Sequence, residues 1–543
     1  MIDLECLAYS VGHADDGICL LVRIGIHRIL LDCGITNISL LTNEIKEDLP
    51  ADIVLCSHAH SEHAQGLLAL CRTFPHLPIY ASEATTKLLP LNWPELDMCE
   101  VPDFCQPLPW RSPVELLSGL TVELFPAGHL PGATVFLLTY NGENRTYKLL
   151  YTGDFYLSKS RLVEGLPLAD LRGLKLDVLI VEGSYGTAHY PHRRQLENNL
   201  AERIYQAISS GTSVILPAPP LGLGQELLML LRSHHYFTGR DLDIWVEEKV
   251  ARGCDLYLQL LSQFPTTVQN FAQHQPLFWD DKVKPRVLRR SPGQLPSTEK
   301  PYILIADQDN DLSQYIINQN NPVIALLPEQ PGKKTSQELD FAHSEKYLLS
   351  DHCDRIGTTQ LIHNLRPQHI IFINGCPSYL ADLVNLEELR NRYKLHSPTN
   401  GKLVELPLGE TFIAPKLLKT NYEGELNELE TEVIISLPQS IRDDKHWPTF
   451  SDTGLVEVRW QGEELVLRGI SQREFISQTT DRFISPELYC CANCLHYRGQ
   501  RCSNPVSSLY DLKVTFDGYC PMFESVHFPF TPTGEIDNTD QNE

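Results

Sequence analysis

The chain has 543 residues, 42% of them hydrophobic and 21% charged, and this composition excludes a mainly disordered protein. At about 150 residues per domain, the length predicts three or four domains. Asp and Glu number 69 against 45 Lys and Arg, so the formal net charge is −24. Because nonspecific binding to nucleic acids requires a basic surface, this balance excludes a general polyanion-binding surface but permits one local basic groove.

The sequence indicates neither membrane insertion nor secretion. It contains no run of about 18 apolar residues, and residues 1–10 lack the basic and apolar regions of a signal peptide. We therefore expect a cytoplasmic protein with no membrane partner. In a reducing compartment, the cysteines scattered singly between Cys6 and Cys376 are expected to be small buried hydrophobic residues rather than disulfides.

The first 190 residues have the pattern of short strands separated by turns. Apolar runs of strand length occupy residues 29–31, 53–55, 120–125, 148–151 and 178–181. Polar loops follow these runs and hold most of the histidines of this region. A sheet scaffold that carries a functional site on its loops is therefore expected.

From about residue 192 the pattern changes to alternating helices and strands. Helices are expected from 192 to Gly211, over 225–232 and over 251–264, and strands over 213–216, 242–246, 302–306 and 323–327. This alternation predicts a parallel sheet with helical crossovers. A strand at 347–349, a helix at 358–365 and a strand at 370–373 continue the pattern to about residue 415. The acidic segment 423–432 is expected to be a solvated connector, and the last residues a frayed acidic tail.

A cluster of histidines follows the strand predicted at 53–55. It contains His58, His60 and His63, and Glu62 lies between them. Imidazole is the commonest protein ligand for zinc-like ions, so such a cluster at a strand end can converge on one metal ion. The alternative is that these are three solvated loop histidines. Asp32, His129 and Asp154 also follow strand-like runs, and their common position supports the metal interpretation.

The order of these residues resembles the metallo-β-lactamase fold, whose motif is H-x-H-x-D-H. Residues 181–186 (VEGSYG) are similar to the E-S-T-Y-G segment of the β-CASP nucleases, and residues 350–354 (SDHCD) resemble their S-A-H-x-D segment. Residues 221–230 resemble the start of a family helix, without its Arg, and Asn374 occurs where the family usually has a histidine. The resemblance spans about residues 1–415. The β-CASP family includes ribonuclease J and the endonuclease of messenger-RNA 3′-end cleavage.

The resemblance implies an α/β fold, namely an αββα sandwich interrupted by a parallel α/β β-CASP domain, with RNA bound in the cleft between them. It also implies that one Zn²⁺ is held by His58, His60 and His129, that Glu62 and His63 hold a second, and that Asp154 bridges both. Asp32 would orient a ligand histidine. Glu182 and His352 would lie beside the metals, where His352 could protonate the leaving oxygen while Glu182 fixes its tautomer.

Two residues depart from the family pattern, and both belong to the second metal site. Glu62 stands where the motif has Asp, and Asn374 replaces an imidazole ligand with an amide. We therefore expect one tightly bound and one weakly bound zinc. These departures leave open a catalytically impaired RNA-binding or scaffold protein with a partial metal site. A small-substrate hydrolase on the same fold is disfavoured because it would not need the inserted domain.

Positive charge is concentrated in one run within the expected β-CASP domain, near Trp279. The run consists of Lys282, Lys284, Arg286, Arg289 and Arg290. A basic groove with an aromatic surface would suit single-stranded RNA. An ordinary solvated loop is the alternative explanation of the run.

Five cysteines lie close together near the C-terminus. Cys491, Cys494, Cys502 and Cys520 have the spacing C-x2-C-x7-C-x17-C, and Cys490 is an additional thiol. This pattern predicts a small metal-binding module that holds either Zn²⁺ or a [4Fe–4S] cluster. Free or regulatory thiols are the alternative.

These patterns together predict a zinc-dependent ribonuclease, an endonuclease on single-stranded RNA, which could also form homo-oligomers or bind a protein partner. The expected organisation is a metallo-β-lactamase domain at 1–191 that resumes at 341–415, with the β-CASP domain at 192–340 between its two parts. A connector at 416–475, a Cys-rich module at 476–530 and a tail at 531–543 would follow.

Overall fold

The computed structural model describes most of the chain up to residue 408 and several short segments beyond it. The described ranges are 4–13, 17–41, 49–96, 100–143, 145–290, 300–315, 322–329, 331, 344–408, 421–428, 433–436, 456–461, 464–469, 494–498 and 501–505. The chain divides into two compact units, Met1–Ala414 and Pro415–Glu543. Among the described residues, none of the helices combines the length and the apolar character that crossing a bilayer requires.

Two seven-stranded mixed sheets form the core of the first unit. The first has the order β20 (Lys402–Glu405), β1 (Leu4–Val11), β2 (Ile18–Ile24), β3 (His27–Leu31), β4 (Ile53–Leu55), β5 (Ile79–Ser82), β6 (Cys105–Leu108). The second has the order β19 (Lys394–His396), β18 (His369–Ile373), β11 (Val178–Glu182), β10 (Thr146–Tyr151), β9 (Thr134–Asn141), β8 (Leu120–Pro126), β7 (Val114–Leu117).

The two sheets pack face to face through one apolar cluster. Alternate residues of β1, among them Leu4, Cys6 and Ala8, are fully buried in this cluster, together with Phe136 and Leu138 of β9. This period of two is the pattern of strands that bury one face. The cysteines Cys6, Cys19, Cys33, Cys56, Cys105, Cys254 and Cys353 are buried thiols.

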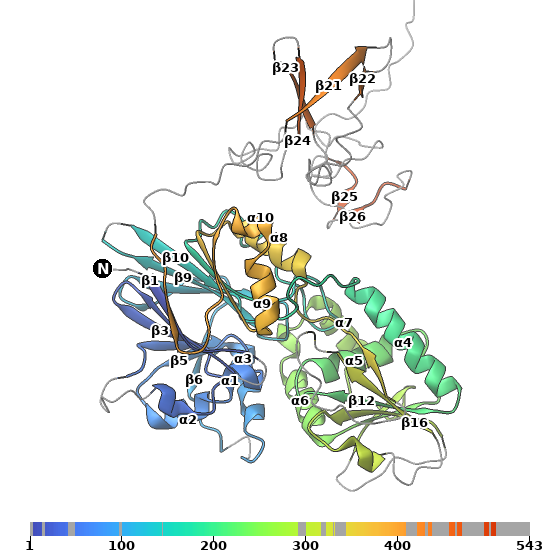
Figure 1. The fold of residues 1–543 in the computed structure, drawn as a ribbon. Helices are drawn as coiled ribbons and strands as arrows, with labels where there is room; N and C mark the ends of the chain where they lie inside the picture. The colour runs from blue at the N-terminus through green and yellow to red at the C-terminus, as the bar shows by residue number, and fades with distance from the viewer. Residues whose placement is uncertain are drawn as a thin grey trace, which may run out of the picture. The chain divides into compact units, whose positions relative to one another are not determined.

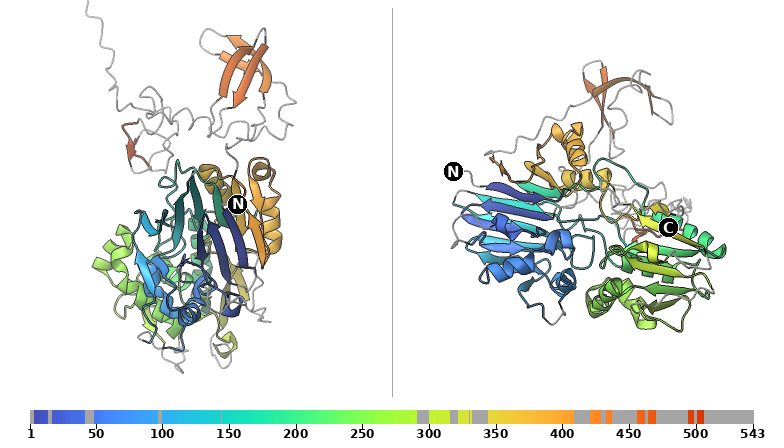
Figure 2. Two further views of the ribbon diagram at one scale, coloured as in Figure 1. Left: turned by 90° about the vertical axis from the view of Figure 1, so that its left-hand side faces the viewer. Right: turned by 60° about the horizontal axis from the view of Figure 1, so that its bottom comes forward.

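Helices cover the outer face of each sheet, which gives four layers (Figure 2). The helices near the first sheet are α1 (Ser61–Ala64), α2 (Leu67–Thr73) and α3 (Glu83–Leu88). Those near the second sheet are α8 (Arg355–Leu365), α9 (Pro377–Val384) and α10 (Glu387–Arg390). This is the αββα sandwich that the sequence predicts.

A second domain is inserted between β11 and β18. These two strands are parallel neighbours in one sheet, with Val178 opposite His369, although nearly two hundred residues of chain separate them. The inserted domain contains a six-stranded sheet in the order β14 (Arg286–Arg289), β13 (Asp243–Val246), β15 (Ile303–Asp307), β12 (Ser213–Ala218), β16 (Val323–Pro328), β17 (Ser344–Tyr347). Its helices are α4 (Arg193–Ser209), α5 (Leu223–Ser233), α6 (Glu248–Gln259) and α7 (Thr266–His274) (Figure 1).

Every strand pair of the inserted sheet is parallel. All residues of β12 and β15 are buried, as expected for a parallel sheet with covered faces. The carboxyl ends of parallel strands meet at one edge, where ligands of α/β sheets commonly bind. We therefore expect the inserted domain to contribute to a binding site through this carboxyl edge.

The inserted domain differs from the sequence-based expectation in three places. The third helix ends at Gln259 rather than 264, because Leu261–Gln263 form a 3₁₀ turn. The last strand is Ser344–Tyr347, which extends the inserted sheet beyond residue 340. The basic run contains the edge strand β14, which was not expected because its four residues, RVLR, show no alternation of polar and apolar types.

The second unit contains a four-stranded sheet where a connector was expected. Its order is β22 (Val433–Ser436), β21 (Asn421–Glu428), β24 (Glu464–Gly469), β23 (Val456–Gln461). Residues 423–428 of the acidic segment therefore lie in a strand rather than in a connector, and residues 429–432 lie outside the described residues. The glutamates of this segment alternate with Tyr422, Gly424 and Leu426, which is the period of a strand as well as a run of charge. A short hairpin, β25 (Tyr497–Arg498) and β26 (Arg501–Cys502), is also described.

Candidate metal centre

The strands of the sandwich deliver the candidate residues at their carboxyl ends. Asp32 follows β3, the histidine cluster follows β4, His129 follows β8, Asp154 follows β10 and Glu182 ends β11. Asp32 has a φ of 58°, a left-handed conformation in which the chain turns sharply out of β3. Residues far apart in the sequence thus meet at one end of the sandwich.

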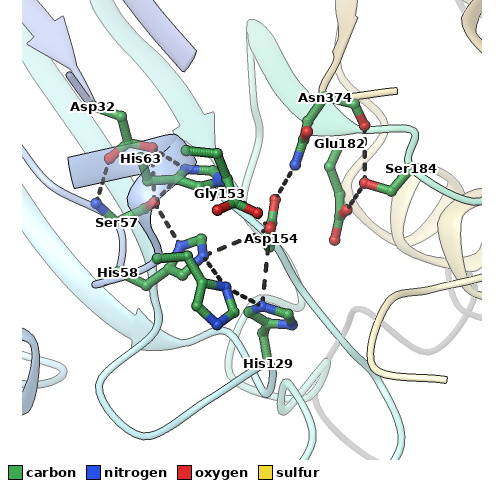
Figure 3. A network of polar contacts seen from close by, with 12 residues as sticks. Asp32, Ser57, His58, His63, His129, Gly153, Asp154, Glu182, Ser184 and Asn374 are labelled. Carbon is green, nitrogen blue, oxygen red and sulfur yellow. Dashed lines mark hydrogen bonds and ion pairs between the residues drawn. The ribbon is translucent and has the colours of Figure 1, made fainter. Parts of the chain in front are cut away.

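Three imidazole nitrogens converge at the centre of the site (Figure 3). His60 Nδ1 lies 3.2 Å from His58 Nε2 and 3.1 Å from His129 Nε2. Asp154 Oδ2 lies 3.6 Å from His58 Nε2 and 3.9 Å from His129 Nε2. One ligand atom from each of these four residues lies within 4.8 Å of the others.

This donor set fits a metal ion. Burial lowers the pKa of His60 to about 4 and that of His58 well below its usual range, so both imidazoles are neutral at pH 7. A neutral imidazole has a single N–H. Hydrogen bonds among the three facing nitrogens of His58, His60 and His129 therefore cannot satisfy all of them. Neutral imidazole nitrogens and a carboxylate in a tetrahedral set are typical zinc ligands.

His63 is oriented by Asp32. His63 Nδ1 donates to Asp32 Oδ2 at 2.7 Å, and Asp32 also accepts hydrogen bonds from the Ser57 amide at 2.6 Å and from the Tyr151 hydroxyl. The other ring nitrogen, Nε2, is buried 3.3 Å from Asp154 Oδ2 but forms no hydrogen bond. Burial disfavours the charged ring, but Asp154 and Asp32 outweigh it and raise the pKa of His63 well above its usual value. His63 Nε2 therefore faces the same oxygen of Asp154 as His58 and His129 do, and its ring centroid lies 4.0 Å from that of His58.

The two departures from the family pattern lie beside the cluster, Asn374 next to Asp154 and Glu62 close to His60. Asn374 has a φ of 49°, and its Nδ2 donates to Asp154 Oδ1 at 2.5 Å. The amide therefore presents a donor, not a ligand oxygen, to the carboxylate. Glu62 is half-buried beside the cluster and accepts a hydrogen bond from the Ser61 hydroxyl. It does not belong to the group of four residues that can share one ion.

His352 and Glu182 form a pair next to the cluster. His352 Nδ1 donates to Glu182 Oε2 at 2.7 Å, and Glu182 is itself fixed by the Phe155 amide and the Ser184 hydroxyl, each at 2.5 Å. Burial disfavours the charged imidazole, but Glu182 and then Asp351 outweigh it and raise the pKa of His352 to about 10. The His352 ring is therefore protonated on both nitrogens and positively charged at pH 7.

Asp351 is a site residue that the sequence did not identify. Its carbonyl oxygen accepts from His129 Nδ1 at 3.0 Å, and its Oδ1 accepts from the Tyr185 hydroxyl at 3.1 Å. Oδ1 also lies 3.7 Å from His352 Nε2. The one signal for it was its position beside His352, where the family motif has Ala.

The metal cluster opens into a cavity of about 400 Å³ between the sandwich and the inserted domain. From the sandwich it is lined by His60, Glu62, His129, Asp154 and His352, and from the inserted domain by Pro220, Leu223, Lys249, Gln308, Asp309 and Glu329. The latter group lies at or near the carboxyl edge of the inserted sheet. This cavity is large enough for part of an extended substrate.

The basic run does not reach this cavity. Its ion pairs are those of Lys284 with Asp241, Arg286 with Asp241 and Asp243, Arg289 with Asp255, and Arg290 with Glu247. Arg289 also covers the face of Trp279 at 5.1 Å, and Lys282 does not line the cavity. The structure thus places Arg286 and Arg289 on an edge strand with Lys284 and Arg290 beside it, and these four side chains are paired with carboxylates.

Part of the cysteine cluster lies outside the described residues. Cys491 and Cys520 are outside them, while Cys494 is half-buried and Cys502 is buried at the hairpin of β25 and β26. The Tyr497 amide donates to the Cys494 carbonyl at 3.1 Å, so a tight turn follows Cys494. The proposed four-thiolate site therefore stays a prediction.

Comparisons with known proteins agree with the fold. The model of the beta-lactamase superfamily domain matches residues 27–214. An uncharacterized protein of Synechocystis sp. is 48% identical over 96% of this chain and 97% of its own length. A probable RNase of Methanocaldococcus jannaschii is 29% identical over 42% of this chain, and endoribonuclease ysh1 of Schizosaccharomyces pombe is 23% identical over 76% of it.

The match spans 55% of the length of the Methanocaldococcus protein and 60% of that of the Schizosaccharomyces protein. The superfamily domain includes the histidine cluster and Asp154, and the longer alignment includes the inserted domain. On these grounds the chain belongs to the β-CASP family of metallo-β-lactamase-fold nucleases.

Proposed function

We propose that the chain is a zinc-dependent endoribonuclease that hydrolyses phosphodiester bonds of single-stranded RNA. The observation that carries the proposal is the convergence of three imidazole nitrogens on Asp154, beside the His352–Glu182 pair and open to one cavity. The relatives named as an RNase and an endoribonuclease support RNA as the substrate. They also disfavour a purely noncatalytic scaffold.

In this proposal His58, His60, His129 and Asp154 hold one Zn²⁺ tightly. His63, Asp154 and Glu62 would hold a second ion weakly, because Asn374 donates to the shared carboxylate instead of ligating. A carboxylate-rich site that lacks an imidazole suits harder ions such as Mn²⁺ or Mg²⁺ better than zinc. Bound Zn²⁺ supplies a Lewis acid and lowers the pKa of water towards neutrality.

The residues of the chain supply orientation and a proton. Asp32 holds His63 by its Nδ1 proton, which leaves Nε2 free to ligate. In hydrolysis a water oxygen bonds to phosphorus while the bond to the leaving ribose oxygen breaks. His352 would donate its Nε2 proton to that leaving oxygen, and Glu182 would stabilise the protonated ring through Nδ1.

The C-terminal cysteines form a second part of the proposal. Cys491, Cys494, Cys502 and Cys520 would hold a structural Zn²⁺ or a [4Fe–4S] cluster, since four closely spaced thiolates are typical of both. The module of residues 476–530 would then owe most of its folding free energy to the metal.

The test combines metal analysis with RNA cleavage. Purified protein should contain zinc beyond the amount bound by the cysteines, and it should cut internally labelled single-stranded RNA. A chelator should abolish cleavage, and added Zn²⁺ or Mn²⁺ should restore it. Metal-loaded protein that leaves RNA intact under all of these conditions would overturn the proposal.

A further inference from the structure

The cavity beside the metal centre is strongly acidic for a site that would bind RNA. Its carboxylates are Glu62, Asp154, Asp309, Glu329 and Asp351. Among the described residues that line it, Lys249 is the one Lys or Arg. Away from the metal site and the protonated His352, phosphates of an RNA strand would meet repulsion over much of this surface, so the position of this Lys becomes important.

Lys249 projects from the inserted domain, opposite the histidine cluster. It lies in the first turn of α6, directly after the carboxyl end of β13. Gln308 and Asp309, which follow β15, line the same cavity. A strand that reaches the metal centre through this cavity must therefore pass the carboxyl edge of the inserted sheet.

Two carboxylates hold the Lys249 ammonium in place. Its Nζ lies 2.7 Å from Asp307 Oδ2 and 3.5 Å from Asp309 Oδ2. The Asp307 side chain is 2% exposed, whereas that of Asp309 is 66% exposed and that of Lys249 is 41% exposed. Burial opposes the charge on Lys249, but the hydrogen bond and the charge of Asp307 outweigh it and raise its pKa.

This arrangement leaves part of the ammonium available. An ammonium group has three N–H donors, and the buried Asp307 needs only one of them. The contact with Asp309 is long and exposed to solvent, so an incoming anion can replace it at little cost. Asp307 thus fixes the side chain, and the partly exposed ammonium, which lines the cavity, keeps donors for an anion.

We propose that Lys249 binds a phosphate of the RNA strand next to the scissile one. The inference rests on the proposed function, because it assumes that the cavity receives RNA. Lys249 would then be a substrate-positioning cation of the inserted domain. In the basic run at 282–290, by contrast, Lys284, Arg286, Arg289 and Arg290 are paired with carboxylates, and none of the run lines the cavity.

The experiment compares Lys249→Gln with Arg252→Gln. Arg252 lies on the same helix and is paired with Glu248, but it does not line the cavity, so it is a matched control for the loss of one charge. Cleavage of a fluorescent single-stranded RNA is followed in the full-length, metal-loaded protein over a series of salt concentrations. Metal content and thermal unfolding are measured for each variant, and Lys249→Arg tests whether charge alone restores binding.

We expect Lys249→Gln to raise KM by roughly three- to tenfold while kcat changes less than about twofold. The slope of log(kcat/KM) against log[salt] should become shallower by about 0.7, the value for one contact to a single strand. Arg252→Gln should match the parent protein, and Lys249→Arg should recover most of the loss.

The outcomes distinguish this inference from the proposed function. If the parent protein cleaves RNA and Lys249→Gln has the parent KM and salt slope, the phosphate contact is excluded. A fall in kcat or metal content without a change in KM would assign Lys249 to the metal centre and also contradict the inference. If the parent protein with full metal content neither binds nor cuts RNA, the proposed function fails, and this inference fails with it.

Discussion

Asp154 is the residue at which the two sides of the metal centre meet. Its Oδ2 lies between 3.3 and 3.9 Å from nitrogens of His58, His63 and His129, while its Oδ1 accepts from Asn374. Burial alone would raise its pKa, but His63 and the neighbouring imidazoles hold it well below its usual range. One carboxylate oxygen is thus free for ions, and the other is engaged by an amide.

The asymmetry around Asp154 predicts the metal stoichiometry. Asn374→His combined with Glu62→Asp removes the amide donor and supplies an imidazole and a shorter carboxylate at the second site. The left-handed backbone at residue 374 suits Asn and is also accessible to His. Metal analysis of the full-length variant after dialysis should therefore show about one more equivalent than the parent.

The parent protein serves as the reference because both forms carry the same C-terminal cysteines. Equal metal content in the two forms would contradict a weakened second site in the parent. So would a parent hydrolase site that already retains two zinc ions through dialysis.

A substitution at His352 is expected to affect catalysis rather than metal binding. Replacing His352 with Ala removes the proton donor but none of the four residues that can share an ion. RNA cleavage should fall by at least about a hundredfold, the scale of a lost general acid, with unchanged metal content. His363→Ala, a histidine of α8 outside the cavity, is the matched control. Cleavage at the parent rate by His352→Ala would show that the leaving oxygen takes its proton elsewhere.

At the scale of elements, the inserted domain is joined to the sandwich by a buried ion-pair network. Arg193, the first residue of α4, is 5% exposed and donates to Glu197, to Glu226 of α5 and to the Ser350 carbonyl. Arg161 of the sandwich also binds Glu197 at 2.7 Å. The network therefore links two helices of the inserted domain to the segment that carries His352.

This network predicts a large effect of one substitution. Arg193→Met leaves Glu226 buried without its Arg partner and Glu197 with Arg161 alone, so the free energy of unfolding should fall by about 3–5 kcal/mol. Arg194→Met, at the exposed neighbouring position, should change it by less than about 0.5 kcal/mol. Urea unfolding of the two variants makes the comparison. A loss in Arg193→Met no larger than in Arg194→Met would mean that the buried pairs contribute little.

Sequence patterns located most elements because their apolar residues repeat at helical or strand spacing. The runs at 53–55 and 178–181 became β4 and β11, and His58, His60 and His63 could be placed at a strand end for the same reason. β14 was missed because it is short and shows no alternation, and β21 was missed because Asn and Glu fill its alternate positions. The roles of Asp351 and Lys249 could not be predicted, since they depend on how the inserted sheet lies against the sandwich.

At the scale of the whole molecule, the candidate metal centre and the crowded cysteines lie in different compact units. The metal centre and its cavity belong entirely to the unit Met1–Ala414, and the crowded cysteines belong to the unit Pro415–Glu543. Loss of metal from one unit should therefore leave the other folded. Chelator sensitivity of RNA cleavage would report on the first unit alone.

The last prediction uses this separation. Replacing Cys491 and Cys494 together with Ser removes two of four thiolates, which is enough to lose a tetrahedral zinc or a [4Fe–4S] cluster. The variant should contain one metal equivalent, or one cluster, fewer than the parent, and protease should cut its residues 476–530 faster. RNA cleavage and the thermal unfolding of the first unit should stay the same.

Cys490→Ser, which changes the adjacent thiol outside the C-x2-C spacing, is the control. Visible absorbance that disappears in the double variant would identify iron–sulfur, and loss of zinc without colour would identify a zinc module. Unchanged metal content and unchanged proteolysis would show that these thiols hold no metal, because a site bound through four thiolates cannot survive the loss of two.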